Sequence, residues 1–297
     1  MGVCAYNEEQ NIGQLLSVLQ HEVLLDEIIV VASGCTDRTV EIAQQFPVKV
    51  IVQEKREGKA SAINMFIDVA KGDILILESA DTIPLPHALE QLIELLDQDD
   101  IGAVGGHPKP LNDSQCLTNH IVNLIWDLHH LTALQSPKIG EAIAFKRVFK
   151  QIPRYTLTDE ACIEAVVRAQ GYKVVYAPDA IFINKGPQTM TDLFRQRERI
   201  QLGHLYLRKD LGFNVSTANA FDTVKLLIQH GYFIRSPFTV ILAVLVEARC
   251  RYKAKRAYRQ QQKNGTVQTG IWNMVVSSKD LVGSKCHEQV ESSKDNS

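Results

Sequence analysis

The sequence predicts an α/β fold in which a parallel-dominated mixed sheet lies between helices and is followed by a C-terminal helical extension. Short β-branched runs alternate with helically spaced apolar residues through the first hundred residues, and the character of the chain changes after about residue 210. A chain of 297 residues with 45% apolar and 22% charged residues suits one large domain with an appendage, or two domains.

The first hundred residues supply most of this alternation. Ile12, Leu15, Leu16 and Leu19 have helical spacing and predict a helix over residues 9–22. The β-branched run that follows is typical of a buried parallel strand. The chain begins almost immediately with a strand-to-loop signal. In chain order, the remaining pattern predicts strands at 27–32, 48–52, 73–77, 142–145 and 173–176, and helices at 36–45, 59–70, 86–96, 117–134 and 159–170.

The predicted sheet also indicates where a ligand binds. Alternating strands and helices place helices on both faces of a mainly parallel sheet. Ligands of such sheets bind beyond the carboxyl ends of the strands. This rule selects three loops, at residues 4–9, 32–38 and 78–84.

Composition excludes several classes of protein. A net charge of −2 argues against nucleic acid as a partner, because proteins that bind nucleic acids usually need a strongly positive surface. The six cysteines are scattered, without a CxxC pair, and indicate reduced, intracellular thiols. The N-terminus has no basic leader before an apolar run, so we expect no secretory signal. No GxGxxG motif follows a strand, which argues against a dinucleotide enzyme.

Acidic residues end two predicted segments in a pattern that suits chemistry on a diphosphate. Glu78 and Asp81 follow one strand, and Asp159 and Glu160 stand together before a helix. A diphosphate leaving group needs a divalent cation held by carboxylates, and an attacking hydroxyl needs a general base. The alternative for each acid alone is a structural role, as a helix N-cap or as a carboxylate in the first turn of a helix.

Six short motifs in order give the chain a family resemblance. Across about residues 3–204 it resembles the inverting family 2 glycosyltransferases of the GT-A fold. The matching segments are AYNEE at 5–9 (the YNEE loop), SGCTDRT at 33–39 (the DGSTDGT turn), REGKASAIN at 56–64 (GKxxAxN), SAD at 79–81 (the metal-binding DxD), TDE at 158–160 (the TED base motif) and QRERI at 196–200 with Gly203 (QxxRWxxG of membrane-associated synthases).

The resemblance implies roles for individual residues in an inverting transfer from a nucleotide-diphosphate sugar. It implies that Asp81 binds Mg²⁺ or Mn²⁺ and that Glu160 is the general base, with Asp159 as the fallback base. The residues that it implies for binding the nucleotide sugar are Tyr6 at the base, Glu8 at the ribose or base, Lys59 near the donor, and Gln196 and Arg199 toward the pyrophosphate.

Three departures from the family pattern bear on these roles. Ser79 replaces the first Asp of DxD, which leaves Asp81 to hold the metal alone, with Glu78 in the sheet or in support. The TED acids are reversed in Asp159 and Glu160. Ile200 replaces a Trp that supports an acceptor sugar, which favours a single transfer over polymer synthesis. Ser79 also leaves open a catalytically weak or inactive sugar-nucleotide-binding protein, and a nucleotidyltransferase is a further alternative.

The acceptor is assigned by resemblance alone. Glu141 lies where relatives often carry polar acceptor-side residues, and Trp272 resembles the start of a closing WxxxxST(K/R) stretch. These features imply a glycan or lipid-linked acceptor. We expect the catalytic domain at residues 1–205, a helical and possibly membrane-interfacial region at 206–282 and a disordered tail at 283–297.

The C-terminal region suggests where the protein works. An apolar run at residues 237–246 leads into a basic stretch at 247–259, a combination that favours shallow insertion into an anionic membrane surface. The run is much shorter than the roughly 20 residues that span a bilayer. The alternative is a helix buried against the catalytic core. We therefore expect a cytoplasmic protein, held peripherally on the inner face of a membrane.

Overall fold

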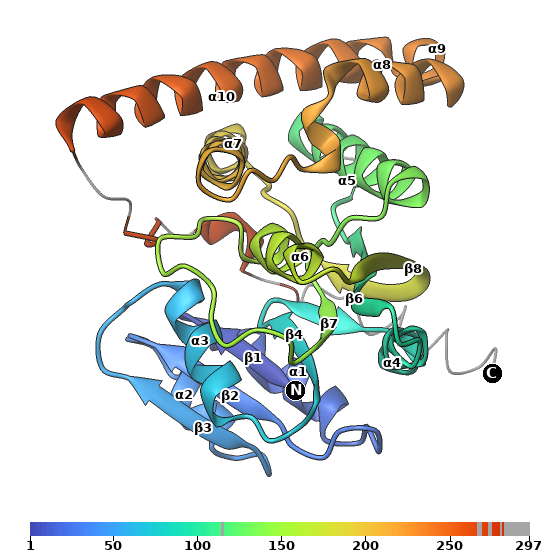
Figure 1. Cartoon of the computed structure of the whole chain (residues 1–297). Coiled ribbons are helices and arrows are strands. Elements are labelled where there is room, and N and C mark those ends of the chain that lie inside the picture. Colours follow the sequence, from blue (N-terminus) through green and yellow to red (C-terminus); the bar gives the residue numbers. More distant parts are fainter. Residues whose placement is uncertain (114–115, 266–268, 273–274, 280, 282–297) are drawn as a thin grey trace.

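The computed structural model describes residues 1–113, 116–265, 269–272, 275–279 and 281 of the chain. Figure 1 shows an α/β body that contains the N-terminal strands and a helical layer that lies across it, with α10 (Pro237–Asn264) outermost. The tail expected at residues 283–297 lies outside the described residues. Among the described residues, no helix is long and apolar enough to cross a membrane.

One mixed sheet organises the body. Its four neighbouring strands β3, β2, β1 and β4 are parallel, β7 is antiparallel to both β4 and β6, β8 is parallel to β6, and β5 is antiparallel to β8. Within the described part of the chain the eight strands are β1 (Gly2–Ala5), β2 (Ile29–Ser33), β3 (Lys49–Gln53), β4 (Ile74–Ser79), β5 (Thr82–Pro84), β6 (Ile101–Pro110), β7 (Ile143–Lys146) and β8 (Lys173–Asn184).

Two of these strands were not predicted. β6 has the sequence IGAVGGHPKP, whose glycines and prolines disfavour a strand, yet it lies inside the sheet between β7 and β8. Its glycines are required by packing, because a Cβ on Gly106 would lie 2.5 Å from the Phe182 ring. The segment predicted as a turn contains β5, which pairs with the unexpectedly long end of β8.

Helices cover both faces of the sheet, as predicted. The helices in chain order are α1 (Ile12–Leu19), α2 (Thr39–Ala43), α3 (Lys59–Val69), α4 (Ala88–Leu96), α5 (Leu117–Gln135), α6 (Asp159–Ala169), α7 (Met190–Asp210), α8 (Ala220–Gln229), α9 (Tyr232–Arg235) and α10. Along β2, Val30 packs with α1 and α4 on one face, whereas Ile29 and Val31 pack with α3 and α6 on the other. This alternation explains why β2 is buried at every position.

The C-terminal region packs against the body at two places. Arg197 of α7 pairs with Glu247 of α10 at 3.0 Å, and Arg249 of α10 pairs with Glu198 at 2.8 Å. Beyond α10, the described residues of 269–281 return to the sheet, where the Leu281 amide donates to Asn11. The domain boundary expected at residues 205–206 lies inside α7.

Candidate active site

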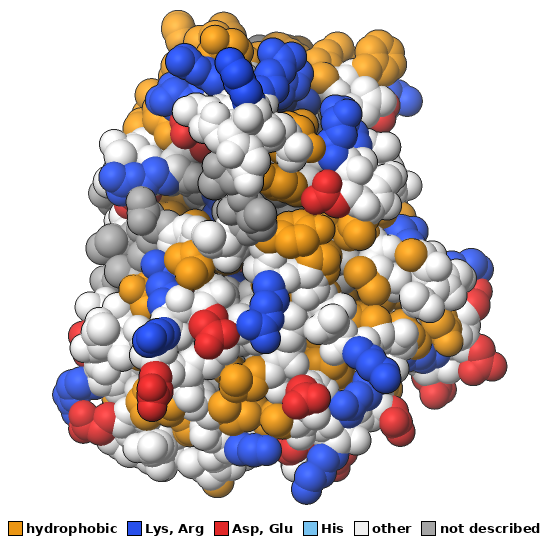
Figure 2. Space-filling model, turned by 60° about the vertical axis from the view of Figure 1, so that its left-hand side comes forward, with side chains coloured by type: hydrophobic (Ala, Val, Ile, Leu, Met, Phe, Trp, Pro, Cys, Tyr) orange, Lys and Arg blue, Asp and Glu red, His pale blue; other side chains and the backbone are white. Residues whose placement is uncertain are grey.

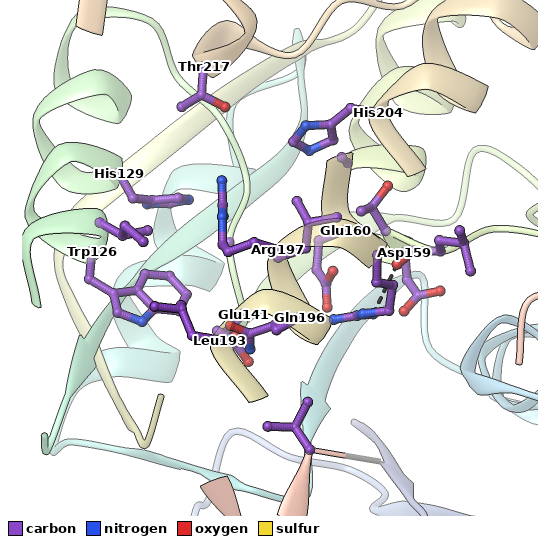
Figure 3. Close-up of a pocket in the computed structure, with 18 of the residues that line it drawn as sticks. Trp126, His129, Glu141, Asp159, Glu160, Leu193, Gln196, Arg197, His204 and Thr217 are labelled. Atoms are coloured by element: carbon purple, nitrogen blue, oxygen red, sulfur yellow. Dashed lines mark hydrogen bonds between the residues drawn. The ribbon is translucent and has the colours of Figure 1, made fainter. Parts of the chain in front are cut away.

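A cavity of about 560 Å³ lies at the carboxyl ends of β1, β2 and β4, where the sequence predicted a ligand. All ten residues singled out from the sequence line it, whereas their roles stay predictions. These residues are Tyr6, Glu8, Lys59, Asp81, Glu141, Asp159, Glu160, Gln196, Arg199 and Trp272. Figure 3 shows the part of the cavity around Glu141, Glu160 and Gln196.

Lys59 connects the two acidic motifs. It is the first residue of α3, directly after Gly58, whose φ of +92° turns the chain into the helix. The Lys59 ammonium donates to Glu160 Oε1 at 2.7 Å and to Ser79 Oγ at 3.0 Å, and it lies 3.8 Å from Asp159. Burial lowers the pKa of Lys59, but Glu160 and Asp159 outweigh it and raise the pKa above its usual value. Lys59 therefore stays charged.

The two acids that begin α6 differ in their exposure. They are first-turn residues, as the structural alternative proposed, and they also line the cavity. Asp159 is 1% exposed and its Oδ1 has no hydrogen-bond partner among the described residues. Burial raises the pKa of Asp159 to about 6. The Glu160 side chain is 20% exposed, so it is the acid that a ligand in the cavity reaches more easily.

Asp81 is the carboxylate available for a metal. It lies between β4 and β5 and does not cap a helix, because α4 begins after His87. Burial raises its pKa, with a further contribution from Glu160. No group of three or more acidic, His or Cys side chains that could hold a metal occurs in the described ranges. In general, Mg²⁺ can be bound by one or two protein carboxylates, with the oxygens of a substrate diphosphate completing its coordination.

Glu78 does not take part in the cavity. It is completely buried in β4, and its Oε1 accepts a hydrogen bond from the Thr82 hydroxyl at 2.8 Å. Burial raises the pKa of Glu78 to about 8. The sequence suggested that Glu78 lies either in the sheet or in support of the metal. The structure shows Glu78 inside the sheet.

Two side chains that the sequence did not assign, Arg56 and Lys279, contact Tyr6 and Glu8 at the end of the cavity near β1. The Arg56 guanidinium lies 3.9 Å from the centre of the Tyr6 ring. Glu8 accepts a hydrogen bond from Asn11 at 2.9 Å and pairs with Lys279. Arg56 begins one of the family motifs, but Lys279 lies 271 residues from Glu8, and no local pattern predicts such a contact.

Arg199 and Trp272 form the opposite wall. The Arg199 guanidinium lies 4.3 Å from the Trp272 ring centre and donates to the Leu157 carbonyl at 2.9 Å. Its Nε has no hydrogen-bond partner within the part of the chain that the structure describes. The Trp272 carbonyl accepts from Arg56, so this segment joins the two ends of the cavity.

Solved structures identify the fold. A mannosyltransferase from Pyrobaculum calidifontis, in complex with GDP-Man and Mn²⁺, has a TM-score of 0.59 over 99% of this chain and 83% of its own, at 18% identity. Glucosyl-3-phosphoglycerate synthase from Mycobacterium tuberculosis, with Mn²⁺ and UDP-Glc, has a TM-score of 0.52 over 72% of this chain and 79% of its own, at 20% identity. The fold is that of GT-A glycosyltransferases, as predicted.

The sequence places the protein more narrowly. Residues 2–150 match glycosyl transferase family 2, and the chain belongs to this family of glycosyltransferase enzymes.

Curated relatives extend the similarity toward the C-terminus. Poly-beta-1,6-N-acetyl-D-glucosamine synthase of Staphylococcus aureus strain COL is 28% identical over 259 residues, which are 81% of this chain and 62% of the relative. The protein of the same name from Staphylococcus epidermidis is 28% identical over 72% of this chain and 57% of its own. The chain thus spans less than two thirds of the length of these relatives.

Proposed function

We propose that the protein transfers a sugar from a nucleotide-diphosphate sugar to an acceptor hydroxyl, with inversion at the anomeric carbon. The observation that carries this proposal is the common cavity in which Glu160 and Asp81 meet, with Lys59 2.7 Å from Glu160. A single displacement needs one base for the acceptor and stabilisation of one leaving group. These residues supply both, and inversion needs no enzyme nucleophile.

The base in this proposal is Glu160, with Asp159 as the alternative. Glu160 is the more exposed of the two, and Lys59 holds its carboxylate in place, so it can accept the proton of an acceptor hydroxyl. Asp81 would hold Mg²⁺ or Mn²⁺ together with the donor diphosphate. When bound, this cation neutralises the charge that develops on the leaving diphosphate.

The donor would occupy the end of the cavity near β1. We assign the base to Tyr6, the ribose or base to Glu8, and the pyrophosphate to Arg199, with Gln196 and Lys59 near the sugar. Arg199 suits an anion because its Nε is buried and has no hydrogen-bond partner among the described residues. Glu8 would exchange its pairing with Lys279 for a ligand hydroxyl.

The acceptor in this proposal is a glycan or a lipid-linked sugar, contacted by Glu141 and Trp272. The names of the relatives favour an N-acetylhexosamine as the transferred sugar. We further propose that the protein acts at the inner face of a membrane, to which its outermost helices bind.

A panel of UDP- and GDP-sugars, with Mg²⁺ or Mn²⁺, tests the proposal by product release and by thermal shift. We expect at least one donor to be turned over. Asp81→Asn should abolish transfer and the metal-dependent part of donor binding, whereas Asp68→Asn, an exposed change on α3, should not. Full activity of Asp81→Asn in the presence of a chelator contradicts the metal assignment, and donor binding without turnover favours a sugar-nucleotide-binding protein.

A further inference from the structure

The part of the cavity near α10 is lined by positive charges that the proposed catalytic roles do not use. Lys138, Arg197 and Arg251 line it together with His204. Figure 3 shows Arg197 and His204 on the side of the cavity toward Thr217, opposite Glu141. The carboxylate of Glu247 is shared, because it lies 3.0 Å from Arg197 and 3.1 Å from Arg251. Two guanidinium groups thus lie beside one carboxylate at this end of the cavity.

Lys138 adds a third basic side chain, with which no described carboxylate forms an ion pair. Its ammonium makes no ion pair with a described residue, and Glu164, the nearest acid to act on it, is engaged by Arg168 at 3.0 Å. Burial and Arg197 lower the pKa of Lys138 to about 7. Burial and the three neighbouring cations lower the pKa of His204 to about 3, so His204 is neutral. An anion that binds beside this half-buried ammonium of Lys138 would stabilise its charged form.

The same cavity continues between α8 and α10 toward an apolar surface. Leu227 and Val240 form its buried wall, at 2% and 1% exposure. Val224 and Val244 also line it, and they are 42% and 50% exposed at the outer surface. A ligand in this cavity would therefore meet cations at its inner end and aliphatic side chains toward the surface.

We propose that Lys138, Arg197 and Arg251 form a subsite for a phosphate group of the acceptor, and that an apolar chain attached to this phosphate lies between α8 and α10. The inference deepens the proposed function, on which it rests, by naming the acceptor as a phosphate-bearing lipid. Cations and an aliphatic channel match the two halves of such a molecule. Glu160 lines the same cavity, so the acceptor hydroxyl can reach the base while its phosphate is held.

Calorimetric titration separates the two halves of the subsite. The titrants are dodecyl phosphate, dodecanol and glucose 1-phosphate, each added to protein with saturating nucleoside diphosphate and Mg²⁺ so that the donor end is occupied. We expect dodecyl phosphate to bind at least ten-fold more tightly than either of the others. Lys138→Gln should weaken the binding of dodecyl phosphate by about ten-fold or more, because a charge-assisted hydrogen bond is lost. Its effect on dodecanol should be small.

Control variants exclude a general effect of lost charge or of lost stability on the titrations. Lys173→Gln removes an exposed lysine that pairs with Asp100, and it should leave all three titrations unchanged. Lys138→Gln should not lower the melting temperature, since it removes a half-buried ammonium that forms no ion pair with a described residue. Ala243 lines the apolar part of the cavity between α8 and α10. Ala243→Phe fills this part, so it should weaken the binding of dodecyl phosphate and leave the binding of glucose 1-phosphate unchanged.

Two results would overturn the inference. If Lys138→Gln binds dodecyl phosphate as tightly as the wild-type protein does, the anion subsite is contradicted. If the wild-type protein binds glucose 1-phosphate and dodecyl phosphate with equal affinity, the proposal that the acceptor is a lipid is contradicted. Turnover of the donor panel by the wild-type protein is measured separately. Its absence contradicts the proposed function, whereas the titrations judge the subsite alone.

Discussion

Glu160 and Asp159 are adjacent in the sequence but occupy different environments. Asp159 is buried and its Oδ1 lacks a partner among the described residues, whereas Glu160 reaches the cavity beside the Lys59 ammonium. A base must contact the acceptor hydroxyl, so exposure to the cavity favours Glu160. The sequence alone identified the pair but ranked its members only through the family motif.

Glu160→Gln should therefore leave donor affinity nearly intact and remove most of the turnover, by about 10²-fold or more. A base acts on the acceptor in the transition state and contributes little to binding of the nucleotide. Donor affinity by calorimetry and initial transfer rates measure the two effects. Asp159→Asn is the paired variant: if it abolishes turnover while Glu160→Gln spares it, the two roles are reversed.

Glu78 makes stability depend on pH. Burial raises its pKa from 4.5 to about 8, so the folded protein keeps a proton that the unfolded chain releases near pH 4.5. Between these values the unfolded state binds fewer protons, and the free energy of unfolding falls as pH rises, by at most about 1.4 kcal/mol per pH unit. Glu78→Gln should remove this fall.

Urea unfolding at pH 5 and pH 8 measures the free energy of unfolding of the wild-type protein and of Glu78→Gln. The stability of Glu78→Gln relative to the wild-type protein should increase from the lower to the higher pH. A difference between the two proteins that does not change with pH would show that Glu78 is ionised in the folded state.

At the scale of single elements, the turn after β2 depends on a glycine. Gly34 has a φ of +65°, and a Cβ at this position would lie 2.4 Å from the Arg56 backbone nitrogen. Gly34→Ala should therefore lower the free energy of unfolding by about 3 kcal/mol, from backbone strain and overpacking together. It should also weaken donor binding, because Arg56 covers Tyr6.

Gly212→Ala is the matched control. Gly212 has the same φ of +65°, but nothing lies within 4 Å of its added Cβ. Gly212→Ala should lower the free energy of unfolding only by the backbone strain, about 1 kcal/mol, and should leave donor binding unchanged. Equal losses for the two variants in urea unfolding would show that the contact with Arg56 is not rigid.

The elements themselves were predictable where side-chain periodicity is strong. The residues that define α1 by spacing are the residues it buries. The carboxyl ends of β1, β2 and β4, with the loops after β1 and β4, line the cavity, as the position of ligands on parallel sheets requires. β6 was missed because its glycines and prolines disfavour a strand locally, whereas close packing in the sheet leaves no room for a Cβ at Gly102 and Gly106. The contact of Lys279 with Glu8 was missed for the same reason, since it forms only in three dimensions.

At the scale of the whole molecule, the outermost helices carry an unusual surface. Phe238, Ile241, Leu245 and Tyr252 lie on one side of α10 and are between 55% and 80% exposed. Figure 2 shows hydrophobic side chains at this end of the molecule, bordered by Lys and Arg. The buried-helix alternative holds for other residues of α10, such as Val240, Val246 and Cys250. The helix thus has one face toward the protein and one toward solvent.

The basic residues of α10 divide in the same way. The sequence grouped them all as headgroup ligands, but Arg249 pairs with Glu198 and Arg251 with Glu247. Lys253, Lys255, Arg256 and Arg259 are exposed. These four are therefore the residues through which the helix would contact an anionic surface, while Arg249 pairs with Glu198 of α7 and Arg251 pairs with Glu247 within α10.

We expect the protein to bind vesicles that contain anionic lipid and to be released as the salt concentration rises, because exposed charges are screened. Changing Lys253, Lys255, Arg256 and Arg259 to Gln should weaken co-sedimentation by about 1 kcal/mol per residue. The matched control changes four exposed lysines of the catalytic half, Lys55, Lys71, Lys150 and Lys173, to Gln and should bind as the wild type. Phe238→Ser should weaken the binding that persists at high salt, because that part depends on apolar insertion. Equal binding to neutral and anionic vesicles, or none to either, contradicts the membrane surface and leaves α10 as a packing helix.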